Sequence, residues 1–267
     1  MEKKANIRLI RNATLRISYA GKNILVDPML ADKGTLQSAL GVYKTPRVHL
    51  TMPMHEITDG LDMVMLTHNH IDHYDPTVIR HLPKDILFLT QPQDKETVAS
   101  DGFINVEAIE ESKTIDGITI HRTLGHHGFG QIGKMMGSVS GYVLTAEDCP
   151  VVYIMGDCRW EACTRCVVDT FNPDYIVVNS GGAVFPEYSI TDGAIIPDEK
   201  EVMTMLDEIP SHIRLIAVHM DATDHGQTTR AILRNEALHT GVDMRRLLIP
   251  EDGDSVVLLA ISQIVYK

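Results

Sequence analysis

Short apolar segments alternate with short polar ones along the chain, and this alternation predicts a layered α/β protein. Segments 14–19 and 23–27 flank Ala20-Gly21-Lys22, a spacing typical of a β-hairpin. The continuous apolar run 63–67 has strand length and suits a strand buried on both faces. Further strands are expected at 86–89, 118–123, 138–145, 151–155, 174–179, 213–218 and 255–265.

Helices are expected between these strands. Asp75-Pro76 opens one that runs to about His81, because proline suits the first helical turn. Others are expected near 93–100, 159–169, 199–208 and 228–239. The interleaving predicts sheets inside and helices outside. We interpret 1–267 as a single domain and the long irregular stretch 29–60 as a lid or pocket insertion.

Composition narrows the class of protein. The 267 residues are 44% hydrophobic and 22% charged, which is ordinary for a globular protein. Asp and Glu number 36 against 24 Lys and Arg, and the net charge of −12 disfavours a nucleic-acid partner. No apolar run reaches membrane-spanning length or resembles a signal peptide, so we expect no membrane partner and a cytoplasmic location. The sequence leaves the oligomeric state open, and a homo-oligomer is one possibility.

Several apolar strands lead directly into polar segments. Segment 63–66 leads to Thr67-His68-Asn69-His70, and 118–124 leads to Gly125-His126-His127-Gly128. The same holds before Gly156-Asp157-Cys158, Asn179-Ser180-Gly181-Gly182 and His219-Met220-Asp221. If these strands point the same way, the polar groups gather on one rim of the sheet, where functional sites usually lie.

The densest of these segments predicts a metal site. Residues 68–75 contain three histidines and two aspartates directly after a buried strand. Imidazole nitrogen and carboxylate oxygen are natural ligands for zinc and similar ions. A turn can aim His68 and His70 at one ion, while Asp72 and His73 lie further along and can face a second.

The pattern His68-x-His70-x-Asp72-His73 resembles the metallo-β-lactamase fold superfamily. The stretches 127–133 and 138–141 resemble the branch of ascorbate-6-phosphate lactonase-like hydrolases. The resemblance implies a four-layer αββα sandwich, in which two mixed β-sheets are flanked by helices. It also implies two divalent metal ions, with zinc favoured and manganese, iron or nickel as alternatives.

The resemblance further assigns the ligands. The first ion would take His68, His70 and His127, the second would take Asp72, His73 and His219, and Asp157 would bridge both. Asp27 would not bind a metal ion itself but would contact and orient one of the ligands. Cys158 stands where the family usually has threonine, and it could perturb metal preference or simply be a small buried residue.

Two of these assignments have close competitors. His126 and His127 are adjacent and cannot both point into the site from an extended chain; the motif favours His127. The last ligand could be His219 or His225, and His219 is favoured because it directly follows an apolar strand. His225 would then face the substrate or form a bond that supports a metal ligand.

Three other features have simpler interpretations. Residues 128–133 match the dinucleotide-binding pattern G-x-G-x-x-G, yet a strand at 138–145 follows them where that motif needs a helix. Cys163-x-x-Cys166 lacks a second cysteine pair, which leaves a redox or zinc role weakly supported. Arg230 could pair with a substrate anion or form a structural ion pair.

These features predict a hydrolase that cleaves a small ester, lactone or phosphoester, which could be anionic, with a metal-bridged hydroxide. Asp72 would orient the hydroxide or take its proton. Residues 29–60 and 180–197, including Phe185 and Tyr188, would shape the pocket. A di-iron oxidoreductase on the same fold and a non-catalytic metal-binding sensor are the alternatives.

Overall fold

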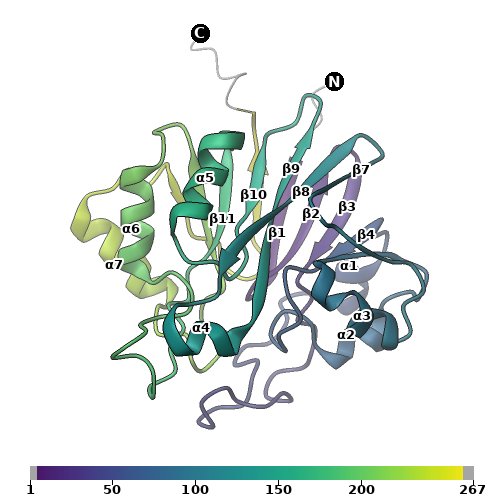
Figure 1. Cartoon of the computed structure of the whole chain (residues 1–267), viewed down its shortest axis with the longest axis horizontal. Helices are drawn as coiled ribbons and strands as arrows, with labels where there is room; N and C mark the ends of the chain where they lie inside the picture. The colour runs from purple at the N-terminus through teal and green to yellow at the C-terminus, as the bar shows by residue number, and fades with distance from the viewer. Residues whose placement is uncertain (1–4, 261–267) are drawn as a thin grey trace.

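Two seven-stranded β-sheets lie face to face in the computed structural model, which describes residues 5–260. The first sheet has the order β14-β1-β2-β3-β4-β5-β6 and the second β13-β12-β11-β10-β9-β8-β7 (Figure 1). The strands of the first sheet are β1 (Ala5–Arg11), β2 (Thr14–Tyr19), β3 (Lys22–Val26), β4 (Met63–Met65), β5 (Leu87–Thr90), β6 (Val106–Ala108) and β14 (Ser255–Leu258). Those of the second are β7 (Ser112–Ile115), β8 (Ile118–His126), β9 (Ser138–Ala146), β10 (Val152–Ile154), β11 (Tyr175–Asn179), β12 (Arg214–Val218) and β13 (Leu247–Leu248).

Each sheet joins an antiparallel half to a parallel half. Strands β14, β1, β2 and β3 pair antiparallel, and β3 to β6 pair parallel. In the second sheet β7 to β10 are antiparallel and β10 to β13 parallel. Antiparallel neighbours need only a tight turn, whereas parallel neighbours need a crossover. The helices supply the crossovers, and both sheets are mixed, as predicted.

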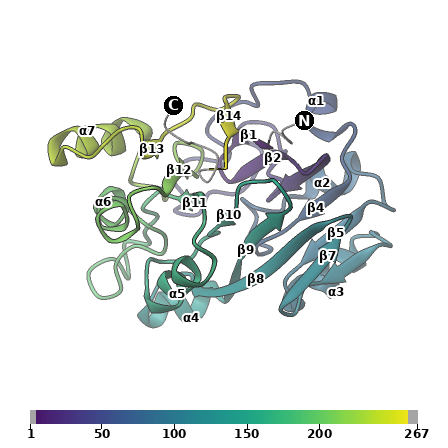
Figure 2. The ribbon, with the colours of Figure 1, turned by 90° about the horizontal axis from the view of Figure 1, so that it is seen from above.

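The helices form the two outer layers (Figure 2). The first sheet is covered by α1 (Met54–Thr58), α2 (Pro76–His81) and α3 (Lys95–Ser100), the last preceded by the 3₁₀ turn η1 (Pro92–Asp94). The second is covered by α5 (Ala162–Phe171), α6 (Glu199–Glu208) and α7 (Arg230–Thr240). One apolar core fills the space between the sheets and another lies under each helical layer. The αββα sandwich is confirmed.

Asp75 shows how a single residue orders the region near the predicted metal loop. Its Oδ1 accepts the backbone N–H of Thr77 at 2.6 Å and so caps α2, with Pro76 in the first turn. Its Oδ2 accepts the N–H groups of Leu30, at 2.5 Å, and Ala31, at 2.8 Å. The buried carboxylate therefore fastens the chain after β3 to the start of α2.

The predicted elements match most of the longer elements and miss six others. Helix 199–208 is found as predicted, and β8 continues three residues beyond its predicted end. The elements α1, β6, β7 and β13 were not predicted, because two to five residues show no measurable periodicity. The seven-residue elements β1 and α4 were not predicted either. Of the expected strand 255–265, β14 covers the beginning, and residues 261–265 lie outside the described residues. No helix within 5–260 has the length and apolarity to cross a bilayer.

A core substitution tests the packing between the sheets. Ile17 of β2 is fully buried among side chains of both sheets. Ile17→Ala should lower the free energy of unfolding by about 2–5 kcal/mol, since it removes buried methyl groups and leaves a cavity. Urea unfolding measures the change. Ile104→Ala is the control, because Ile104 is 79% exposed and its loss should cost less than about 0.5 kcal/mol. Equal losses would contradict the described core.

Candidate functional site

Strand direction brings the polar segments together at one edge of the sandwich. Strands β3 and β4 run parallel in the first sheet, and β8, β10, β11 and β12 run in one common direction in the second. Their carboxyl ends lie at the lower edge in Figure 1, beside the short helix α4 (Gly130–Met136). Asp27, His68, His127, Asp157 and His219 each follow one of these strands within three residues.

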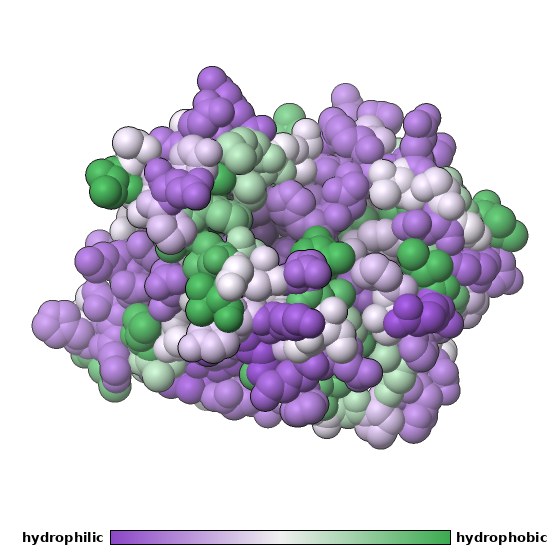
Figure 3. Space-filling view, turned by 90° about the horizontal axis from the view of Figure 1, so that it is seen from below, coloured by the Kyte–Doolittle hydropathy of each residue, from purple (hydrophilic) through white to green (hydrophobic). Residues whose placement is uncertain are grey.

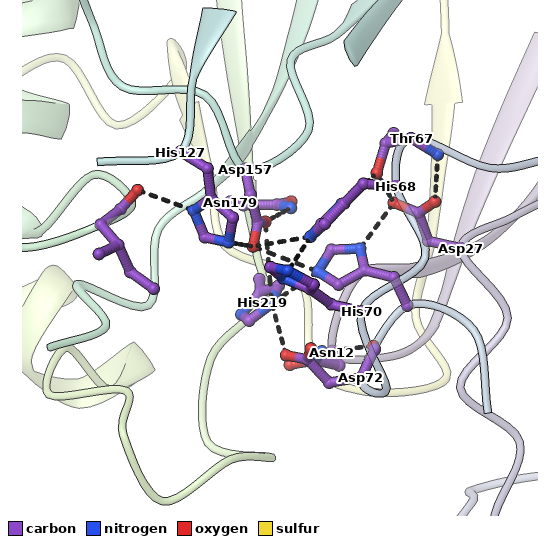
Figure 4. A network of polar contacts seen from close by, with 12 residues as sticks. Asn12, Asp27, Thr67, His68, His70, Asp72, His127, Asp157, Asn179 and His219 are labelled. Carbon is purple, nitrogen blue, oxygen red and sulfur yellow. Dashed lines mark hydrogen bonds and ion pairs between the residues drawn. The ribbon is translucent and has the colours of Figure 1, made fainter. Parts of the chain in front are cut away.

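Asp157 lies at the centre of the resulting cluster (Figure 4). Its Oδ2 is 3.2 Å from His127 Nε2, 3.3 Å from His73 Nε2 and 3.8 Å from His68 Nε2. Its Oδ1 is 3.9 Å from His219 Nε2. One buried carboxylate therefore faces four imidazole nitrogens, two from each of the two predicted ligand sets.

The donors on either side of Asp157 form two groups. Within each, the donor atoms all lie within 4.8 Å of one another, as ligands of one ion must. The groups are His68, His70, His127 and Asp72, His73, His219. These are the two sets predicted from the sequence, and the structure brings all of them together.

Bonds outside the cluster fix which nitrogen two of the imidazoles, His73 and His127, present to it. Asp27 accepts the backbone N–H of Thr67 at 2.8 Å, its hydroxyl at 2.7 Å and His73 Nδ1 at 2.9 Å. His127 Nδ1 donates to the carbonyl of Ile195 at 3.1 Å. A proton on Nδ1 leaves Nε2, which faces Asp157, as the nitrogen that could bind a metal ion, the arrangement usual for metal-binding histidines.

The buried charges of the cluster determine which of its histidines are protonated. Burial lowers the pKa of His127 to about 4 and that of His68 well below its usual value, so both imidazoles are neutral and able to bind a metal. Burial opposes protonation of His73 too, but the carboxylates of Asp157, Asp27 and Asp72 raise its pKa well above the usual value. The buried carboxylates thus demand nearby positive charge, which divalent cations supply. The donor set fits such ions.

Sequence reasoning assigned no role to two asparagines at this edge. Asn179, the last residue of β11, donates from Nδ2 to Asp157 Oδ1 at 2.5 Å. Asn12, in the turn after β1, donates to the Asp72 carbonyl at 3.1 Å and accepts the His219 N–H at 2.8 Å through its own carbonyl. The only signal for them is their position, Asn179 at the end of β11 and Asn12 directly after β1.

Three residues that the sequence analysis considered near the site have side chains that lie away from the cluster. The His126 side chain is 67% exposed and pairs with Glu161, so His127 alone of the pair points inward. Cys158 is buried in the core under the second helical layer, against Gly125, which favours the interpretation as a small buried residue. The guanidinium of Arg230 is buried and pairs with Asp221 and Asp252, and so it is a structural ion pair rather than a substrate contact.

A cavity of about 270 Å³ opens beside the cluster. Viewed from below, the face that carries this edge is hollowed near its middle, with apolar and polar surface around the hollow (Figure 3). His225 and Phe185 line the cavity, whereas Tyr188 packs beside it in a small apolar cluster. His225 is buried and its Nδ1 has no hydrogen-bond partner among the described residues. The cavity lining also includes Gln37, Ser38, Ala39, Thr45, His70, Ile71, Asp72, His127, Met136, Asp157, Ile195 and Thr223.

Known proteins that are similar to this chain point to one family. A family model described as a β-lactamase superfamily domain matches residues 6–219. The UPF0173 protein YddR of Bacillus subtilis is 35% identical, covering 94% of this chain and 98% of its own. A solved "possible metal-dependent hydrolase" of Veillonella parvula has a TM-score of 0.90, 30% identity and covers 97% and 100% of the two chains. An isothiocyanate hydrolase from Delia radicum gut bacteria has a TM-score of 0.88, 34% identity and covers 96% and 100%.

The glycine pattern at 128–133 has a packing explanation. A Cβ at Gly128 would lie 2.8 Å from Ile195, one at Gly130 would meet the Asp192 carboxylate at 2.5 Å, and one at Gly133 would lie 2.4 Å from the Gly128 carbonyl. The glycines let the segment with Asp192 and Ile195 lie against α4, a short helix that the sequence did not predict. Ile195 and Met136, which this packing brings together, line the cavity, and the segment forms no dinucleotide-binding crossover.

A pair of glycine substitutions separates packing from backbone strain. Gly128 and Gly137 both have positive φ, 86° and 78°, but only Gly128 has a neighbour within 4 Å of its built Cβ. Both alanine variants should lose about 1–2 kcal/mol of stability to strain. Gly128→Ala should lose a further 1–3 kcal/mol by overpacking against Ile195, whose carbonyl holds His127. Urea unfolding compares the two, and equal losses would contradict the close packing.

Proposed function

The chain belongs to the β-lactamase superfamily and is a metal-dependent hydrolase of that fold. On this premise, we propose that it hydrolyses small neutral isothiocyanates. The substrate class comes from the cavity together with the isothiocyanate hydrolase, which is similar over nearly the whole chain. The narrower likeness to lactonase-like hydrolases stays a prediction.

The cavity lining is the observation that carries this proposal. None of the described residues that line the cavity is lysine or arginine, although a phosphate or carboxylate group on the substrate would call for one. Ile71, Met136, Phe185 and Ile195 offer an apolar wall instead. A neutral molecule with an apolar substituent and an electrophilic carbon suits these walls better than an anionic phosphoester, one of the substrate classes expected from the sequence.

We further propose that the cluster holds two divalent ions, zinc foremost. His68, His70 and His127 would bind one ion, Asp72, His73 and His219 would bind the other, and Asp157 would bridge them. Four buried Nε2 atoms face Asp157, and outside bonds hold the opposite ring nitrogens of His73 and His127; both observations support this assignment. When bound, such ions lower the pKa of a water and polarise the bond under attack.

Asp72 and His225 both line the cavity and are placed to move protons. Asp72 orients the attacking water and accepts its proton, while the water oxygen bonds to the central carbon of the N=C=S group. His225 faces the same cavity, and burial lowers its pKa, so as a neutral imidazole it would pass the proton taken from the water on to the nitrogen. The resulting thiocarbamic acid releases carbonyl sulfide and leaves the amine, so one water is consumed for each isothiocyanate.

Loss of a central ligand tests the proposal. His68→Ala should lower the metal content and reduce turnover of an aryl-alkyl isothiocyanate at least about 100-fold, since outer partners of metal ligands alone cost 10–100-fold. Metal analysis and amine release measure both effects. His239→Ala, the same change at an exposed position on α7, should alter neither. Full turnover in His68→Ala would reject the ligand assignment, and visible absorption from bound iron would favour the oxidoreductase.

Part of the predicted lid is fastened over the cavity by Asp224. Its carboxylate accepts the backbone N–H groups of Ala39 at 3.2 Å and Tyr43 at 3.2 Å, together with the hydroxyl of Ser38. Ser38 and Ala39 line the cavity, and His225 follows Asp224 directly. One carboxylate thus joins the segment 38–43 to the side of the cavity that carries His225.

Removing this carboxylate should weaken substrate binding more than it slows the chemical step. Asp224→Ala leaves several backbone N–H groups without their acceptor, and we expect KM for the isothiocyanate to rise about tenfold, equivalent to about 1.4 kcal/mol. The value of kcat should change less than KM. Asp243→Ala is the matched control, because the Asp243 carboxylate pairs with its neighbour Arg245 and Asp243 does not line the cavity. An unchanged KM in Asp224→Ala would show that segment 38–43 does not shape binding.

A further inference from the structure

A second group of metal-donor side chains lies outside the central cluster, where β8 meets the start of α5. Its members are His126, Glu161 and Cys163, whose donor atoms lie within 4.8 Å of one another. His126 Nδ1 donates to Glu161 Oε1 at 2.7 Å. The proposed hydrolysis uses none of the three.

Backbone contacts hold this group in place. The His126 N–H donates to Glu161 Oε1 at 2.9 Å, and the Arg159 N–H donates to the His126 carbonyl at 3.0 Å. Glu161 is the N-cap residue of α5 and exchanges bonds with Thr164 in a capping box. The separation of the donors is therefore set by β8 and α5 and does not depend on the chance approach of mobile surface side chains.

We propose that His126, Glu161 and Cys163 form a peripheral site for a thiophilic divalent cation of the zinc class, with water as the fourth ligand. One sulfur, one nitrogen and one oxygen donor suit tetrahedral zinc and suit magnesium or calcium poorly. His126 and Cys163 also line a surface hollow of about 430 Å³, which gives an ion and its water access to them.

The surroundings of Cys163 disfavour a reactive-thiol role. Burial and the neighbouring Glu161 carboxylate raise the pKa of the Cys163 thiol to about 11, so it carries little nucleophilic thiolate at neutral pH. A bound cation would displace the thiol proton. Cys166, one turn further along α5, is exposed and belongs to no donor group among the described residues. The C-x-x-C spacing thus contributes one ligand rather than a pair.

An occupied site would tie the end of β8 to the start of α5. His127, the next residue after His126, belongs to the central cluster. The peripheral cation would therefore hold the strand end that positions a central ligand, although its binding does not depend on the substrate or on the hydrolysis proposed above.

Cobalt substitution tests this site separately from the central one. The central donors are nitrogen and oxygen only, and Cys149 and Cys158 are buried in the cores. In the full-length protein loaded with Co²⁺, we expect a thiolate-to-cobalt charge-transfer band. Cys163→Ser should abolish the band and remove one equivalent of metal, and His126→Ala should weaken Co²⁺ binding there at least tenfold.

Two matched variants complete the experiment. Cys166→Ser should keep the band, because Cys166 is not a ligand, and His68→Ala should keep it while losing metal from the central cluster. The absence of the band in the unaltered protein, its persistence in Cys163→Ser or its loss in Cys166→Ser would each overturn the proposal. Activity enters none of these readouts, so failure here is distinguishable from failure of the proposed hydrolase function.

Discussion

The structure depends on keeping one carboxylate, that of Asp157, buried among imidazoles. A buried charge is costly unless opposite charge and hydrogen bonds compensate it. Asn179 donates to one of its oxygens, and four histidine nitrogens face it within 4 Å. The strand ends that bring these groups together come from both sheets. The αββα stacking, in which the two sheets share one core, is therefore what makes the centre possible.

The strand ends at this centre include unusual backbone. Asp27 and His219 have positive φ values of 46° and 63°, which are uncommon for residues other than glycine. Each occurs where a strand must turn sharply to place its side chain at the centre. Hydrogen bonds hold both turns, since Asp27 accepts three donors and the His219 N–H is bonded to the Asn12 carbonyl. Strain of this kind is typical of functional sites.

The cavity walls are built differently from the centre. They come from loops, and single carboxylates fasten these loops through backbone N–H groups. Asp224 holds segment 38–43, and Asp192 accepts the N–H groups of Gln131 at 2.7 Å and Ile132 at 2.9 Å at the start of α4. Rigid strands thus position the reacting groups, whereas the loops that can vary at little cost to the fold decide which substrate fits.

The sequence by itself predicted the layered architecture, most of the longer elements and the side chains that gather at the centre. The hydrophobic periodicity and the spacing of His68, His70, Asp72 and His73 involve residues close together in the chain. Such patterns can therefore be recognised from the sequence alone. Only the tertiary structure decided that Arg230 is neutralised by acidic neighbours, that Cys158 points into a core, and that His126 turns outward. Those outcomes depend on partners far along the chain, which no local pattern encodes.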